Sequence, residues 1–299
     1  LMTTLQALFA DSQQSLITIP VSSNIGDAMQ LLHDHNIISA PVVDETNKCV
    51  GLVDFIDMAV ELMKIWDRSH KPTAAEMGEI SWKSMEWASE SVGAIINASG
   101  RNPLHTLPLT ATVEEARKIL STGIHRLLVT DADGSAFALL TQSRLLSHCL
   151  TVLSESELGK SVYDVEGLIT DRVIKVGTNE VLHSVLELMV NYKLSSVPVC
   201  NTSGKIVAVF SASDLITMTP HHFLSSVTLP IFSHVESQKD KQMHQVYIFS
   251  NPTSHDVQYV MKTMLNNNIH RMFVLDKRED LTGVIAMTDL LRMEMVKSK

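Results

Sequence analysis

Two His-Arg pairs are the polar residues of this sequence that are best suited to chemistry. His125 and Arg126 follow an isoleucine and precede an apolar run, and His270 and Arg271 repeat this arrangement. Arg presents a fork of N–H donors and His also donates, so each pair can bind phosphate oxygens. Ion pairs with Asp or Glu are the alternative interpretation. Because the pair recurs in the same setting, we favour phosphate binding.

Three aspartates recur at a second equivalent position, just after an apolar stretch: Asp57, Asp214 and Asp289. An ionised carboxylate has two oxygens that can accept both hydroxyls of a ribose, and it is also favoured near the beginning of a helix. The remaining copy has Arg144, which only donates and is expected to block ribose binding at the second site. Helix capping without a ligand is the alternative for each Asp taken alone, and three in register favour a ligand.

Hydroxyl and backbone groups around these positions are secondary candidates for contacts to a nucleotide. The candidate hydroxyls, for a ribose or a phosphate, are those of Thr141, Ser211, Ser213 and Thr288. Backbone groups at Ala40 and Val197 are expected to meet the edge of an adenine in an apolar cleft between strands. Pro41 and Pro198 follow them, and these prolines predict a strand entry or edge because proline lacks a ladder donor.

All these residues belong to four copies of one unit, which align at Ile37, Ile124, Leu194 and Ile269. In each copy a short extended segment precedes an amphipathic helix, an apolar strand, a polar turn, a second strand and a second helix. Helical spacing of apolar residues is clearest between Val257 and Leu265, and the segment from Thr112 to Glu115 predicts a capping box. The order β-α-β-β-α makes the fold class α/β, with small sheets covered by helices.

The expected boundaries follow from this alignment. The apolar strands are predicted at residues 40–43, 127–129, 197–200 and 272–275, and the second strands at 50–53, 136–140, 206–210 and 281–286. We place the units at residues 1–62, 100–155, 156–222 and 223–299, with an insert at 63–99. The insert contains all three Trp residues, and the stretch from Trp82 to Trp87 is expected to form a helix. Packing on the units is the favoured interpretation of that helix, and an exposed partner surface is the alternative.

Composition narrows the class of protein. The chain of 299 residues is 45% hydrophobic and 19% charged, which is typical of a folded globular protein, and its length favours two domains. The net charge of −9 argues against a general nucleic-acid binder. Three cysteines without a CxxC spacing fit a reducing compartment, and no apolar run reaches the ~20 residues of a membrane span. We therefore expect a cytoplasmic or nuclear protein without nucleic-acid or membrane partners.

The unit resembles a CBS domain, and four in tandem resemble two Bateman modules. The whole chain is similar to the gamma subunits of AMP-activated protein kinase. The resemblance depends on three features: the order Asp, Arg, Asp, Asp after the second strands, Ile-His-Arg in the second and fourth copies only, and an insert between the first two copies.

This resemblance implies a regulatory subunit that binds AMP, ADP or ATP, performs no catalysis and contains no metal. It implies a kinase catalytic alpha subunit and a beta scaffold subunit as partners. It also implies that the His-Arg pairs face phosphates in a central region, and that Thr170 reaches a ribose or a phosphate. The chain departs from the family at Ile38 and Ser143, where the animal subunits have Arg and Lys. We therefore expect weaker binding of polyphosphates.

Other functions have less support. The main alternative is a four-CBS scaffold that resembles fungal phosphatase-inhibiting proteins and has weak or no nucleotide binding. S-adenosylmethionine or a dinucleotide is an alternative ligand. An enzyme is the least expected class, because Walker, G-x-G-x-x-G and H-E-x-x-H motifs are absent and no Ser/His/Asp or Cys/His set can be singled out. The neighbours His221 and His222 are expected in a loop rather than at a metal site.

Overall fold

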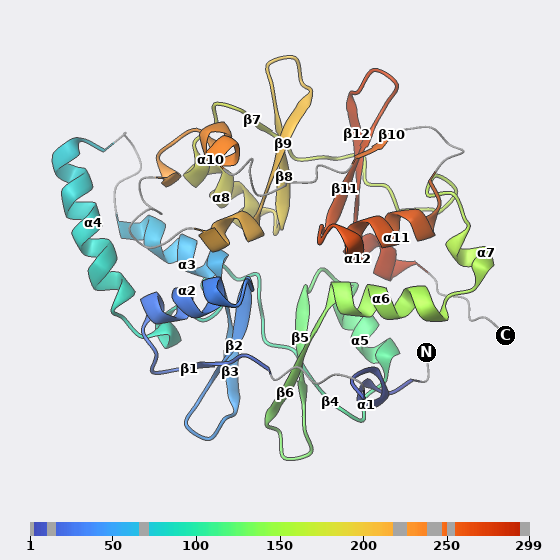
Figure 1. The fold of residues 1–299 in the computed structure, drawn as a ribbon, viewed down its shortest axis with the longest axis horizontal. Helices are drawn as coiled ribbons and strands as arrows, with labels where there is room; N and C mark the ends of the chain where they lie inside the picture. The colour runs from blue at the N-terminus through green and yellow to red at the C-terminus, as the bar shows by residue number, and fades with distance from the viewer. Residues whose placement is uncertain are drawn as a thin grey trace.

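The predicted repeat is visible as four three-stranded sheets, each with its own helices, in a computed structural model of the chain (Figure 1). The structure describes residues 3–10, 16–65, 72–217, 226–237, 247–249 and 255–293, so Trp66, His221 and His222 lie outside the described residues. In each sheet the first strand runs parallel to the middle strand and the third runs antiparallel to it. The predicted α/β class and the order β-α-β-β-α are confirmed.

The strands lie close to their predicted positions. The first sheet contains β1 Ile19–Pro20, β2 Ser39–Val43 and β3 Cys49–Asp54. The second contains β4 Thr106–Pro108, β5 Arg126–Thr130 and β6 Ala136–Thr141. The third contains β7 Val176–Gly177, β8 Ser196–Cys200 and β9 Ile206–Ser211. The fourth contains β10 Tyr247–Phe249, β11 Arg271–Leu275 and β12 Leu281–Ala286.

Two helical segments accompany each sheet. In chain order they are α2 Ile25–Asp34 and α3 Phe55–Leu62, α5 Val113–Leu120 and α6 Gln142–Val152, α8 Leu182–Asn191 and the 3-10 helix η3 Ala212–Thr217, and α11 Val257–Asn266 and α12 Met287–Arg292. The insert contains η1 Met63–Ile65, α4 Ala74–Ala88 and η2 Val92–Ile95, and the segments that precede the first strands contain α1 Leu5–Leu8, α7 Glu155–Leu158 and α10 Ile231–Ser237. Among the described helices, none has the length and apolar character needed to span a membrane.

Local sequence explains the start of α5 and the turn that follows the first helix of each unit. The predicted capping box is confirmed: the Thr112 hydroxyl accepts from the Glu115 amide, and the Glu115 carboxylate accepts from the Thr112 amide. A left-handed residue then turns the chain from the first helix towards the middle strand. The φ angles there are 51° at Asn36, 103° at Gly123, 53° at Lys193 and 52° at Asn268. Gly and Asn adopt this region at low cost, which leaves Lys193 as the unusual member.

The apolar side chains gather in two cores that do not follow chain order. One core combines helices and strands of the first and third units, and the other combines those of the second and fourth. Backbone bridges join the units in the other direction, first to second through Thr4 and Thr112, and third to fourth through Ser161 and Asp256. In Figure 1 the sheets of the first two units lie along one edge and those of the last two along the opposite edge. The helices fill the band between them.

The insert forms the long helix α4 on one flank of the molecule (Figure 1). Its Ile80 and Trp87 side chains are buried in the core shared by the first and third units. Its opposite face is open, with Trp82 64% exposed and Met85 also exposed. Packing on the units is therefore confirmed for one face of the helix, while Trp82 and Met85 on the other face are exposed.

The position of the two prolines differs from the prediction of a strand entry or edge. Pro41 and Pro198 occupy the third residue of β2 and β8, the middle strands of their sheets. They are tolerated because the first strand is very short there: β1 pairs only with Val42 and Val43. The missing N–H therefore faces a side of the strand where no ladder has begun.

Candidate functional site

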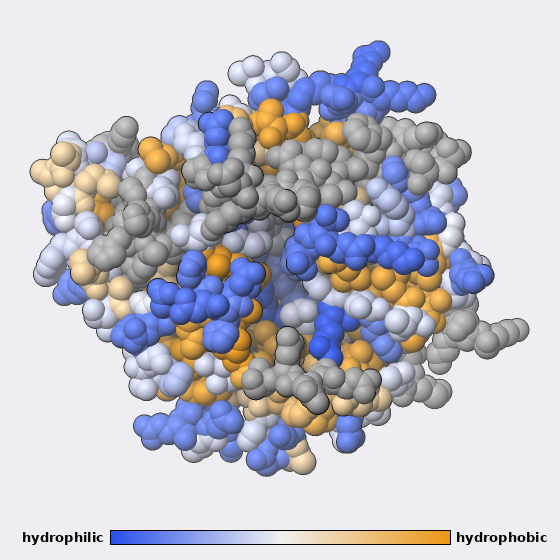
Figure 2. All heavy atoms as spheres, viewed as in Figure 1, coloured by the Kyte–Doolittle hydropathy of each residue, from blue (hydrophilic) through white to orange (hydrophobic). Residues whose placement is uncertain are grey.

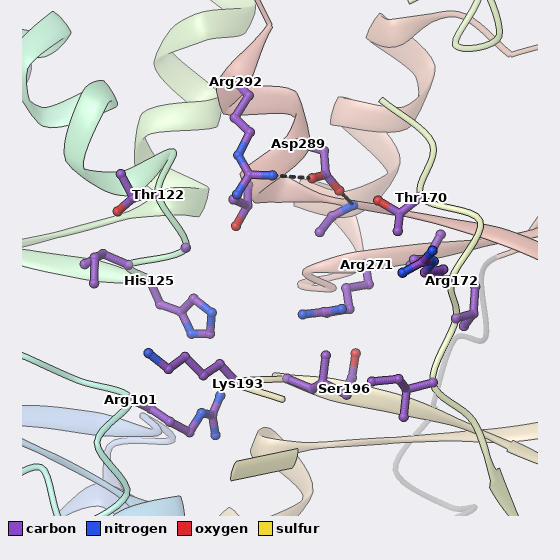
Figure 3. A pocket seen from close by; sticks show the side chains of 18 of the residues that line it. Arg101, Thr122, His125, Thr170, Arg172, Lys193, Ser196, Arg271, Asp289 and Arg292 are labelled. Atoms are coloured by element: carbon purple, nitrogen blue, oxygen red, sulfur yellow. Dashed lines mark hydrogen bonds and ion pairs between the residues drawn. The ribbon is translucent and has the colours of Figure 1, made fainter. Parts of the chain in front are cut away.

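A cleft of about 350 Å³ lies where the second, third and fourth units meet. This volume is within the range of small-molecule sites. In Figure 2 the centre of the face is hollowed, and hydrophilic residues lie inside the hollow. The close view in Figure 3 shows Asp289 and Thr170 on one side of the cleft, with His125, Arg271 and Arg101 around its open middle.

Asp289 provides the carboxylate of the cleft. It is the third residue of α12, and its Oδ2 atom accepts from the backbone N–H of Ala286 at 2.8 Å. Its Oδ1 atom is 3.4 Å from an Nη atom of Arg292, and the side chain is 10% exposed. Burial raises the pKa of Asp289, and the Ala286 amide and the nearby Arg292 and Arg271 oppose that rise. One oxygen thus caps the helix, while the other has only a long contact and remains available to a ligand.

Two hydroxyls border the cleft near this carboxylate. Thr170 belongs to the segment before β7, and its backbone pairs with Val284 of β12 through two hydrogen bonds of 2.9 Å. This pairing brings Thr170, which precedes the first strand of the third unit, to the sheet of the fourth unit. Thr288 is on α12, and its hydroxyl accepts from the Gln142 side chain at 2.8 Å. The proton of the Thr288 hydroxyl therefore points to another acceptor, and a ligand oxygen can serve.

Cations dominate the rest of the lining. Within the described chain the cleft is lined by a single carboxylate, Asp289, and by the cationic side chains of Arg101, Arg172, Lys193, Arg271 and Arg292. Such an excess of cations favours an anion, and planar guanidinium groups match phosphate oxygens.

The two predicted His-Arg pairs come together near this cleft. Burial lowers the pKa of His125 well below its usual range, and Arg101 and Arg126 add to the effect. Burial, with Arg126 and Arg271, lowers the pKa of His270 to about 4. Arg126 is buried and its Nε atom has no hydrogen-bond partner, while Arg271 donates from Nε to the Ser195 hydroxyl at 3.3 Å. Both imidazoles are therefore neutral at pH 7 in the free protein.

Asp57 lies in the equivalent place of the first unit, but its surroundings are closed. Its Oδ2 atom accepts from the Asp54 amide at 2.9 Å and from the Asn102 side chain at 3.3 Å. Its Oδ1 atom accepts from the backbone N–H of Ser99 at 2.9 Å and from the Ser99 hydroxyl at 2.5 Å. The side chain is fully buried, and burial together with Asp54 raises its pKa to about 6. The protein itself thus uses both oxygens, and the ribose role of Asp57 stays a prediction.

Near both Asp57 and Asp289, the segment that leads into the next repeat pairs with the third strand of a sheet. Asn97 donates to the carbonyl of Leu52 on β3, as Thr170 does to Val284 on β12. A Cβ atom at Gly51 would lie 2.2 Å from the Ile96 side chain, and one at Gly283 would lie 2.6 Å from Ile169. Glycine is therefore required at both places for close approach. Two residues beyond the pairing residue, the first module has Ser99 and the second has Arg172.

The third unit's Asp214 is on η3 and does not line the cleft. Its Oδ2 atom accepts from the Ser211 amide at 2.6 Å and from the Ser211 hydroxyl at 3.1 Å, and Ser213 is 3.0 Å from that hydroxyl. Burial raises the pKa of Asp214 to about 6. In all three units the aspartate therefore caps its own helical segment, as the alternative interpretation predicted.

The second unit's slot is covered by the N-terminal segment. The guanidinium carbon of Arg144 lies 4.4 Å from the centre of the Phe9 ring, and Arg144 donates to the Leu8 carbonyl at 3.4 Å. Phe9 is buried and meets Phe137 edge to face, with ring centres 6.1 Å apart. Thr141 accepts from the Arg144 amide and so caps α6. The guanidinium of Arg144 is thus covered by the Phe9 ring. The predicted role of Arg144 in blocking ribose binding stays a prediction.

The remaining predicted residues lie within the sheets. Ala40 pairs with Val53 and Val197 pairs with Phe210, and both side chains are buried. Neither lines the cleft, and their contact with an adenine stays a prediction. Four cationic residues of the cleft escaped the sequence analysis: Arg101, Arg172, Lys193 and Arg292. The left-handed position held by Asn or Gly in the other units was a usable signal for Lys193, whereas no sequence pattern marks Arg101.

Comparison with known proteins identifies the family. The model of the CBS domain matches residues 12–64, 93–150, 162–219 and 246–295. The chain belongs to the CBS-domain family. Its four CBS repeats are paired into two Bateman modules, as the sequence predicted, the first two repeats forming one module and the last two the other.

Relatives extend over nearly all of this chain. It is 22% identical over 289 residues to the 5'-AMP-activated protein kinase subunit gamma of Kluyveromyces lactis, which covers 93% of this chain and 84% of that protein. It is 25% identical to the subunit gamma of Dictyostelium discoideum over 92% of this chain, and 24% identical to Protein SDS23 of Kluyveromyces lactis over 93% of it. The chain spans only 48% and 60% of those two relatives.

Two solved structures share the CBS arrangement. A Methanocaldococcus jannaschii protein described as an archaeal homologue of gamma-AMPK aligns with a TM-score of 0.74 at 17% identity, covering 94% of this chain and 96% of that one. An uncharacterized conserved protein from Pyrococcus horikoshii aligns over the same fractions with a TM-score of 0.53 at 18% identity. At these identities the likeness shows the fold alone.

Proposed function

We propose that this chain is a regulatory subunit that binds an adenine nucleotide in the cleft at Asp289 and performs no catalysis itself. The observation that carries the proposal is the arrangement of polar groups in the cleft: Asp289 and the Thr170 hydroxyl lie on one side, and Arg271, His125 and Arg101 surround the open middle. A nucleotide has the complementary order, a sugar diol followed by phosphates. The similarity to kinase gamma subunits supports the same ligand class.

Each part of the nucleotide has a matching group. The ribose hydroxyls would donate to the Oδ1 atom of Asp289, displacing the long contact from Arg292. Thr170 and Thr288 lie close enough to line the same end of the cleft. The first phosphate would accept from Arg271, and the purine would lie against apolar residues of the lining, among them Val173 and Val284.

Regulation would follow from the position of the cleft between modules. Its walls come from the second, third and fourth CBS repeats, so a bound nucleotide contacts both Bateman modules. A ligand shifts an equilibrium by its differential affinity for two arrangements. We propose that a kinase catalytic alpha subunit and a beta scaffold subunit read this change, because relatives carry the name of a kinase gamma subunit.

Calorimetric titration with AMP, ADP and ATP tests the proposal. Asp289→Ala should weaken each nucleotide about 30-fold, since a charge-assisted contact to the sugar is lost. Asp34→Ala is a matched control, because it removes the same charge from an exposed helix position that does not line the cleft. Absence of heat and of any thermal shift at millimolar nucleotide would overturn the proposal. S-adenosylmethionine and a dinucleotide belong in the same titration as competing ligands.

A second candidate function is a four-CBS scaffold, or a phosphatase-regulating protein, with weak or no nucleotide binding. The closure of Asp57 by Ser99 and the cover of Phe9 on Arg144 favour it, because two of the four slots already hold protein groups. Similarity to Protein SDS23 is compatible with it. If Asp214→Ala and Asp289→Ala leave both nucleotide response and binding of purified kinase subunits unchanged, this function replaces the first.

A further inference from the structure

Arg101 is a buried cation that no described acid binds directly. The side chain is 8% exposed, and its Nε and Nη1 atoms are buried without a hydrogen-bond partner. Burial lowers the pKa of Arg101, and the nearby Asp54 and Asp57 oppose that shift. Neither acid accepts a hydrogen bond from its guanidinium among the described contacts. A buried guanidinium with unpaired N–H groups destabilises the protein unless an anion accepts its hydrogen bonds.

The guanidinium of Arg101 faces the anion end of the cleft. It lines the cavity together with Arg271 and His125, and Figure 3 shows the three side chains entering the same space from different sides. Arg101 also contributes to the lowered pKa of both His125 and Arg271. Asp289 interacts with Arg271 but is not among the groups that affect Arg101. The order from the sugar end is therefore Asp289, Arg271, Arg101.

A tightly bonded loop holds Arg101 in this place. Asn97 and Gly100 have positive φ angles of 50° and 66°, which turn the loop back on itself. The Asn97 side chain accepts from the Asn102 amide at 2.7 Å, which closes the loop. Ser99 donates twice to Asp57, and Asn102 donates to Asp54 at 2.7 Å. The acid pair therefore anchors the residues on either side of Arg101.

We propose that Arg101 binds the distal phosphates of a nucleoside di- or triphosphate, and that Asp57 is the positioning residue that holds the Arg101 loop. This inference rests on the proposed function for the sugar end of the cleft. It gives Asp57 a different role from the ribose contact expected from sequence. It also supplies a cation in place of the two that the chain lacks at Ile38 and Ser143.

The effect of losing Arg101 should grow with the number of phosphates. AMP ends near Arg271, so its affinity depends little on a group farther along the cleft. ADP and ATP extend towards Arg101, and each charge-assisted bond there contributes about a tenfold gain in affinity. A merely structural role for Arg101 would weaken all three nucleotides to the same degree.

The test is calorimetric titration of AMP, ADP and ATP into the full chain and the variant Arg101→Met. We expect losses of about 30-fold for ATP, about tenfold for ADP and under threefold for AMP. Arg101→Lys should recover part of the ATP affinity because it keeps the charge without the fork. Arg278→Met is the matched control: it removes the same charge from an exposed hairpin turn, and should change nothing. Equal losses for all three nucleotides, or no loss, would overturn the phosphate role.

Asp57→Asn tests the positioning role, with Ser99→Ala as a milder variant if the first does not fold. Both should weaken ATP more than AMP, and unchanged ATP affinity in a folded variant would contradict the anchor. Inorganic triphosphate separates this inference from the proposed function. If the wild type binds no nucleotide but triphosphate raises the melting temperature of wild type and not of Arg101→Met, the anion site stands and the nucleotide proposal falls. If triphosphate has the same effect on both, Arg101 is not an anion ligand.

Discussion

Asp57 and Asp289 have the same place in the repeat and the opposite environment. Each is the third residue of the helix after a buried strand, and each uses its Oδ2 atom to cap that helix. The other oxygen of Asp57 accepts two hydrogen bonds from Ser99, whereas that of Asp289 has only a 3.4 Å contact with Arg292. One carboxylate is a structural anchor in this chain, and the other borders an open cleft.

The difference between the two aspartates arises in the segments that pack beside them, around Ser99 for Asp57 and around Thr170 for Asp289. In both modules the leading segment docks on the third strand beside a glycine, Gly51 or Gly283. After docking, the first module's chain turns at Asn97 and Gly100 and places Ser99 on Asp57. The second module's chain continues past Thr170 without such a turn, and Asp289 stays accessible. A repeat position therefore predicts a possible ligand, and the neighbouring loop decides whether the protein or a ligand takes it.

The largest effect is expected when each carboxylate is removed in turn, because Asp57 and Asp289 should then differ in their contribution to stability. Asp57→Ala should lower the free energy of unfolding by about 3 kcal/mol, because it leaves the Ser99 donors and the Asp54 amide without an acceptor. Asp289→Ala should cost about 1 kcal/mol, the value of a helix cap. Urea denaturation followed by circular dichroism measures both. Equal losses would mean that the two sites do not differ as described.

Asp214 adds a third carboxylate to the comparison of Asp57 with Asp289, and its ionisation should make the stability of the protein depend on pH. Its pKa is raised from 3.8 to about 6 by burial, so the folded state binds its proton more tightly than the unfolded state. The resulting stability is complete below pH ~4 and is lost as the pH rises through about 6. Asp214→Asn cannot ionise, so at pH 7 it should be about 2 kcal/mol more stable than wild type.

At pH 4 the same variant should match wild type. The measurement is a pair of denaturation curves at each pH between 4 and 7, which subtracts the opposite contribution of the histidines with lowered pKa. A difference that is constant across this range would contradict the raised pKa of Asp214.

Substitution of Gly51 and Gly283 tests the contact that both modules share, in which the segment before a repeat packs on the third strand of a sheet. Gly51→Ala and Gly283→Ala should each destabilise the chain by about 1–2 kcal/mol, because the new methyl overlaps Ile96 or Ile169. Only Gly283→Ala should also weaken AMP, about threefold, since it displaces Thr170 at the cleft. Thermal melts and titrations of the two variants give both quantities, and equal effects on AMP would show that Thr170 does not contact the ligand.

Several features of this protein were readable in the sequence because they depend on neighbours along the chain. The four repeats, the positions of the strands, the capping box at Thr112 and the Asp, Arg, Asp, Asp series follow from apolar periodicity and turn residues. Pro41 and Pro198 show the limit of that approach: their place inside middle strands is tolerated only because the adjacent strand is short.

Tertiary structure alone decided which of these residues are accessible. The cores join the first repeat to the third and the second to the fourth, which no local pattern encodes. The closure of Asp57, the cover of Phe9 on Arg144 and the entry of Arg101 into the cleft all depend on segments distant in sequence. The physical reason is that a side chain's type and spacing determine what it can bind, whereas its burial and its competing partners are determined by packing.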